Sequence, residues 1–116
     1  MAGSAGVMVM DDSTCMLEAL FAATKFFADE SCGQCSPCRE GAGWLHKVVG
    51  RIAEGRGQPG DLDHLLKTAQ GIAGGTICAL GDAAAVPVVS YITKFRDEFE
   101  SHVREGRCPL TAEVTA

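Results

Sequence analysis

The chain of 116 residues is the size of one domain, and a domain of this length buries about 65% of the surface that its unfolded chain exposes. Its 15 acidic and 10 basic residues give a formal net charge of -5, and the basic residues are scattered, which argues against nucleic-acid binding. The longest apolar run, residues 83–89, is far shorter than the roughly 20 residues that a membrane-spanning helix needs. We therefore expect one acidic domain without direct membrane insertion.

Residues 1–12 form the first predicted segment, an extended lead-in. The run from Val7 to Met10 is apolar on both faces of any strand it could form, and only burial on two sides would satisfy such a strand. We interpret it as a strand that belongs with a neighbouring domain, and a frayed terminus is the alternative. No positively charged region precedes the short apolar stretch, so it does not resemble an export signal and a cytoplasmic location is predicted.

Two helices are predicted in the first half of the chain. The first covers about 14–29, with Asp12 or Ser13 as N-cap and an apolar stripe at helical spacing. The second runs from Pro37 to about Glu54, because Ser36 can cap it and proline is tolerated at the first helical position. Its inward stripe places Cys38 on the buried face.

Two further helices are predicted in the second half. Asp61 caps the third, which ends at Gly74 and Gly75. The last starts between Ala83 and Pro87 and continues to about Glu105, with Pro87 in its first turn. The prediction is an all-α, antiparallel four-helix bundle over residues 13–109 with a cysteine-rich binding loop, followed by a C-terminal tail, 110–116.

Four cysteines form the most informative pattern. Cys32, Cys35 and Cys38 have the spacing C-x2-C-x2-C, and Cys78 follows in a second glycine-rich loop. A 4Fe–4S cluster has four iron corners, each needing one thiolate, so the first three cysteines can form a cap and the fourth can close it. A zinc site is the alternative, with His46 or His64 in place of Cys78. Disulfides are disfavoured because cysteines three apart in a tight turn bridge poorly.

The surroundings of these cysteines suit a negatively charged cluster. The second and fourth helices begin beside the two loops, so their unpaired N–H groups can face sulfur, and Arg39 adds a positive charge. The two remaining cysteines, Cys15 and Cys108, are expected to be small buried hydrophobic residues and are the reserve if a proposed ligand is wrong. The three histidines are expected at the surface or its rim.

Four stretches together resemble a known family: residues 11–16 (DDSTCM), 30–41 (ESCGQCSPCREG), 75–88 (GTICALGDAAAVPV) and 95–100 (FRDEFE). They are similar to the C-terminal iron–sulfur domain of the flavoprotein, NADH-binding subunit of NADH:quinone oxidoreductase, respiratory complex I. The resemblance covers nearly the whole chain. Ser36 stands where threonine is frequent, a change that still allows helix capping.

The resemblance implies a four-helix domain with one 4Fe–4S cluster on cysteines matching Cys32, Cys35, Cys38 and Cys78. It implies electron transfer from FMN, reduced by NADH, to iron–sulfur clusters of neighbouring subunits, in a complex peripheral to the membrane on the cytoplasmic or mitochondrial matrix side. Related subunits serve NAD-linked hydrogenases and formate dehydrogenases. The family's FMN- and NADH-binding portion has no counterpart in these residues, so we expect a fragment of an oxidoreductase that does not oxidise NADH by itself.

Overall fold

The computed structural model describes residues 3–110. Within this range the chain forms five helices and no strand, which confirms the predicted all-α class. The helices are α1 (Met16–Glu30), α2 (Ser36–Ala53), α3 (Asp61–Ile72), α4 (Leu80–Lys94) and α5 (Arg96–Glu105).

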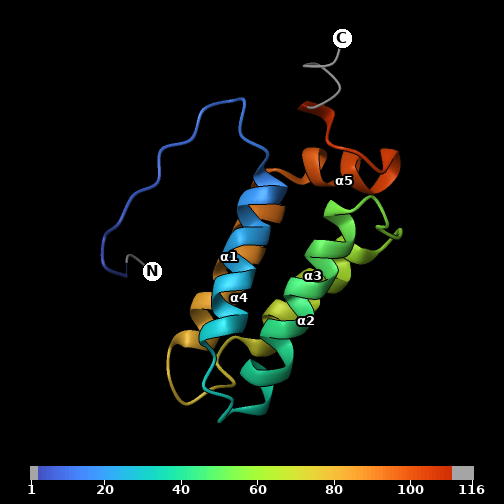
Figure 1. The fold of residues 1–116 in the computed structure, drawn as a ribbon. Coiled ribbons are helices and arrows are strands. Elements are labelled where there is room, and N and C mark those ends of the chain that lie inside the picture. Colours follow the sequence, from blue (N-terminus) through green and yellow to red (C-terminus); the bar gives the residue numbers. More distant parts are fainter. Residues whose placement is uncertain (1–2, 111–116) are drawn as a thin grey trace.

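Helices α1 to α4 run alternately up and down and form a bundle, and α5 lies across one end of it (Figure 1). Helix α1 packs against α2 and α4, and α3 packs against the same two helices from the other side. Because successive helices are antiparallel, the α1–α2 loop and the α3–α4 loop lie together at the end opposite α5 (Figure 1). The two loops with the predicted ligands are therefore neighbours in space.

All five helices contribute to one hydrophobic core. The apolar stripes expected from helical spacing are buried, and α5 adds Phe99, whose side chain is fully enclosed. The residues that fill this core most completely are Leu17, Leu20, Leu45, Val49, Ile52, Leu65, Val88, Ile92 and Phe99. Burial of these side chains holds the bundle together and fixes where the loops emerge.

The prediction of one long final helix is wrong in two respects. Helix α4 already begins at Leu80, so Pro87 lies inside it and not in its first turn. The helix then ends at Lys94, and Phe95, with φ -120° and ψ 34°, turns the chain into α5. Apolar residues keep helical spacing across this turn. The same spacing serves α5, because α5 folds over the end of the bundle and buries Phe99 there. Periodicity alone therefore did not reveal the break.

The helix starts differ slightly from the predicted caps. Helix α1 begins at Met16, after a turn in which the Ser13 N–H donates to Asp11 Oδ1 at 3.0 Å. Asp61 opens α3 as its first residue, and its buried carboxylate accepts hydrogen bonds from Arg51 at 2.6 Å and from the Gln58 N–H at 2.8 Å. Asp61 thus joins α2, the α2–α3 loop and α3.

Residues 3–15 contain no helix; residues 3–13 are exposed and lead away from the bundle (Figure 1), whereas Cys15 is buried in the core. Val7 and Val9 are 84% and 93% exposed, so the apolar run is not covered by the chain's own helices. Residues 1–2 of the predicted lead-in and 111–116 of the predicted tail lie outside the described residues. Among residues 3–110, no helix is both long and apolar enough to cross a membrane.

Candidate metal centre

The first cysteine loop connects α1 to α2. Cys32 is exposed, Cys35 is the N-cap of α2, and Cys38 is buried on the first turn of that helix. Cys35 thus occupies the capping position that was predicted for Ser36, and Pro37 lies in the first turn as expected. The Ser31 hydroxyl lies 3.2 Å from Cys38 Sγ, within hydrogen-bond distance for sulfur. The three thiols therefore follow one tight turn from the surface into the bundle.

The second loop connects α3 to α4 and contains Cys78. Gly74 adopts φ +74°, which favours glycine, and its N–H donates to Asp82 Oδ1 at 2.8 Å. The Thr76 hydroxyl donates to the carbonyl of Cys78 at 2.8 Å. The first bond ties the loop to the first turn of α4 and the second braces the loop internally, so that Cys78, although exposed, is held at a defined place.

The two loops contact each other directly. The Ile77 N–H donates to Cys35 Sγ at 3.4 Å, a bond between residues 42 positions apart. All four predicted ligands line one cavity of about 130 Å³, together with Glu30, Ser31, Gln34, Thr76 and Leu80. The structure thus brings together Cys32, Cys35, Cys38 and Cys78, and it leaves Cys15 and Cys108 elsewhere.

Two helix N-termini adjoin this cavity, and Arg39 binds the loop that forms part of its wall. Helices α2 and α4 both start next to it, and first-turn N–H groups have no partner within their own helix. Arg39 donates to the carbonyl of Gly33 at 2.6 Å and to the Ser36 hydroxyl at 3.2 Å. Arg39 therefore fastens the first loop to α2 and also places a cation beside that loop.

The donor set fits an iron–sulfur cluster. Among residues 3–110, four thiols and no histidine line the cavity, so His46 and His64, the alternative fourth ligands for zinc, lie elsewhere. An amide N–H that already points at Cys35 Sγ is the kind of hydrogen bond that stabilises cluster-bound thiolates. The predicted site residues are thus compatible with the predicted cofactor in both chemistry and placement.

Sequence reasoning missed several residues that shape this end of the bundle. Ser31, Thr76 and Asp82 hold the loops through side-chain hydrogen bonds, and only their position beside cysteines or glycines could have indicated this. The histidine prediction is wrong for His102, which is buried at the far end of the bundle. His64 is exposed, as expected, and His46 is partly exposed.

Gly81 gives a direct test of how the second loop is built. A Cβ at this position would lie 2.6 Å from the Thr76 Oγ1 atom, whereas a Cβ on Gly43 in α2 meets nothing within 4 Å. We expect Gly81→Ala to displace Thr76, at a cost of about 1–3 kcal/mol, and to make bound metal easier to remove. Gly43→Ala is the matched control and should gain about 0.5–1 kcal/mol. Thermal unfolding and the rate of iron loss to a chelator are the measurements, and equal behaviour of the two variants would contradict this account of the loop.

The fold and the site define a helical domain with a four-cysteine cavity, and comparison with known proteins gives the family. Residues 18–102 match the family model described as the NADH-ubiquinone oxidoreductase-F iron-sulfur binding region. The chain therefore belongs to this family of iron–sulfur binding regions, as the resemblance indicated.

Relatives agree with this assignment, and all three named here are F subunits of NADH-quinone oxidoreductase. The chain is 51% identical over 110 residues to the F 2 subunit of Rhizobium meliloti (strain 1021), an alignment that covers 95% of this chain and 26% of that protein. It is 47% identical over 110 residues to the F subunit of Mycobacterium bovis, covering 95% of this chain and 25% of that protein. It is 47% identical over 102 residues to the F subunit of Rickettsia felis, an alignment that covers 88% of this chain and 24% of that protein. The chain thus spans about a quarter of the length of these relatives.

Proposed function

We propose that this chain binds one 4Fe–4S cluster through Cys32, Cys35, Cys38 and Cys78 and transfers electrons within an NADH dehydrogenase complex. The main support is that these four thiols, from two loops, line a single cavity next to two helix starts. When bound, such a cluster supplies reversible one-electron transfer without making or breaking a substrate bond.

The chain's own residues would set the properties of the centre. Burial of Cys38 lowers the local dielectric, which disfavours added negative charge. The hydrogen bond from the Ile77 N–H to Cys35 Sγ would have the opposite effect, as would one donated by the Ser31 hydroxyl to Cys38 Sγ, because each stabilises negative charge on sulfur. The balance between burial and these donors would determine the reduction potential.

The proposed partners are the FMN- and NADH-binding portion of the same subunit and the iron–sulfur subunits of the complex, on the cytoplasmic side of the membrane. Residues 1–12 would lead in from the flavin-binding portion, and residues 13–109 would be the iron–sulfur domain. The exposed apolar run from Val7 to Met10 supports this division, because it offers a surface that a neighbouring domain can bury.

Metal analysis after anaerobic purification tests the proposal. We expect a brown protein with four iron and four acid-labile sulfide per chain, and a paramagnetic signal after reduction by a strong one-electron reductant. A colourless protein with no iron, or with zinc on four sulfur ligands in the cavity, would contradict the proposal.

A kinetic prediction separates electron relay from NADH oxidation. Hydride transfer moves two electrons, so a group that accepts one needs a flavin between itself and NADH. The purified chain should accept electrons from a one-electron reductant and remain oxidised when NADH alone is added, as followed by bleaching of the visible absorption. Rapid bleaching by NADH without flavin would show that the chain has an entry site of its own.

A further inference from the structure

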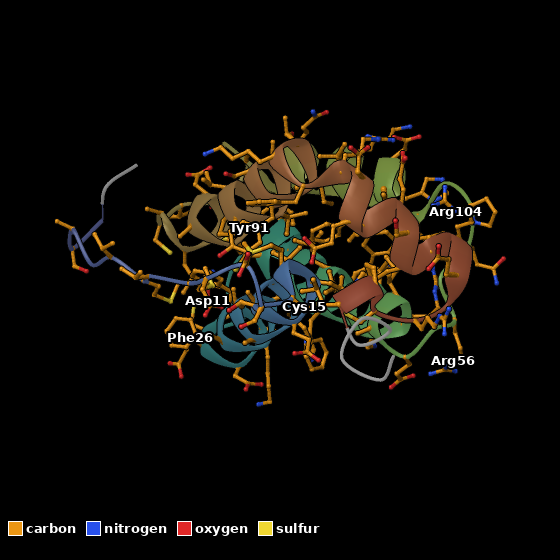
Figure 2. The ribbon with its side chains drawn as sticks, turned by 90° about the horizontal axis from the view of Figure 1, so that it is seen from above. Asp11, Cys15, Phe26, Arg56, Tyr91 and Arg104 are labelled. Carbon is orange, nitrogen blue, oxygen red and sulfur yellow. The ribbon has the colours of Figure 1, made fainter. Side chains whose placement is uncertain are left out.

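A second group of metal-binding side chains lies at the opposite end of the bundle. Cys15 precedes α1, His102 is on the last turn of α5, and Cys108 follows the turn at Gly106. One sulfur or nitrogen atom from each of them lies within 4.8 Å of the others. Cys15 Sγ and His102 Nε2 are 3.3 Å apart. Figure 2 looks onto this end and shows Cys15 at the start of α1 beside the segment that follows α5.

Two members of the group are buried and Cys108 is partly buried. Cys15 is 6% exposed and His102 is 3% exposed. Burial raises the pKa of the Cys15 thiol to about 11, and contact with Cys108 adds to this. Burial also lowers the pKa of His102, against the opposing effect of Glu98 and Glu18. The carboxylates of Glu98 and Glu18 act on His102 and favour a cation in its surroundings.

We propose that Cys15, His102 and Cys108 bind a zinc ion, with water as the fourth ligand. Two thiolates and a histidine are ligands that zinc prefers, and usual Zn–S and Zn–N distances place tetrahedral S and N ligands about 3.5 Å apart. The observed 3.3 Å between Cys15 and His102 is close to that value. Binding would release two thiol protons to solvent, and Zn²⁺ with two thiolates carries no net charge, which suits a buried site.

The site would connect three parts of the fold. Its ligands come from the start of α1, from α5 and from the segment after α5, so Cys15 is 87 or more residues away from the other two along the chain. A shared ion would hold α5 across the end of the bundle, where it places Phe99 in the core. This role does not depend on the proposed iron–sulfur centre, since no residue is shared between the two sites.

The test uses the full, cluster-loaded chain and ZnCl₂ as probe. After zinc loading and washing with a weak chelator, we expect about one zinc per chain with iron content unchanged, and zinc-edge X-ray absorption showing two sulfur ligands and two nitrogen or oxygen ligands. Cys108→Ser and His102→Asn should each weaken zinc retention at least tenfold while iron stays the same. His64→Ala, on an exposed histidine, is the matched control and should retain zinc.

Several outcomes would overturn this site. One is zinc that washes off the unmodified chain. Another is a zinc-edge spectrum with four sulfur ligands, which would place the zinc in the cavity of the four other cysteines. A third is that Cys108→Ser and His102→Asn retain zinc as well as the His64→Ala control does. The spectrum of the unmodified chain decides the matter even where a variant fails to fold. Loss of iron with zinc retained would contradict only the iron–sulfur proposal.

Discussion

Replacing Cys78 by alanine is expected to remove most of the bound iron, although Cys78 is distant in sequence from the other three proposed ligands. Three thiolates leave one iron corner of a 4Fe–4S cluster without a protein ligand and open to water and oxidants. The loss of metal affinity should exceed the roughly 10- to 100-fold loss that is typical when a residue hydrogen-bonded to a metal ligand is removed. Cys78 is exposed, so the substitution leaves the core intact and the helical circular dichroism should persist. Iron and sulfide per chain after anaerobic gel filtration are the measurements.

Cys108→Ala is the matched thiol control for this experiment. It removes a sulfur from the opposite end of the bundle and should leave iron and sulfide at the level of the unmodified chain. If Cys78→Ala kept full iron content in air while Cys108→Ala lost it, the assignment of the fourth ligand would be wrong. The outcome therefore separates the two cysteine groups as well as testing Cys78.

Phe99→Ala is expected to cause the largest loss of stability among single core substitutions, about 3–5 kcal/mol. The Phe99 side chain is 0% exposed and is the largest of the fully buried side chains. Its removal would leave a cavity where α5 meets the bundle, and the surrounding helices could collapse into it only in part. Denaturant unfolding of both proteins under the same anaerobic conditions gives the difference.

Phe26→Ala serves as the matched control for Phe99. Phe26 lies on α1 and is 58% exposed, so its truncation should change the free energy of unfolding by no more than about 0.5 kcal/mol. Similar losses from the two substitutions would mean that α5 is not packed on the core. A small effect at Phe99 would also weaken the proposal that a metal ion holds α5 in place.

The positions of the first three helices followed from the sequence to within a few residues, because the apolar spacing, Pro37 and the glycine stops are local signals. The break at Phe95 did not follow. It depends on where the other helices end, which is a tertiary property, and the apolar spacing continues through it. Pro87 was expected in a first turn because its missing N–H has no cost there, yet α4 extends seven residues before it.

The candidate centre was predictable in its ligand types and only partly in its construction. The cysteine spacing indicated which thiols belong together, and the structure brings those four around one cavity. The bond from Ile77 to Cys35 joins residues 42 positions apart, so no local sequence pattern could indicate it. The hydrogen bonds of Thr76 and Asp82 are local, but they depend on the conformation of the loop. His102 was placed at the surface for the same reason, since only the fold of α5 buries it.

Exposure of Cys32 and Cys78 limits where electrons could enter and leave the proposed cluster. Tunnelling rates fall steeply with the distance between donor and acceptor, so a redox partner of the proposed cluster would have to approach the end of the bundle where these two cysteines are exposed. Helix α2 has 18 residues and is therefore about 27 Å long, which separates the cysteine loops from the α5 end. A partner docked over α5 would be too remote for fast exchange, and current through this domain would have to enter and leave around the cysteine loops.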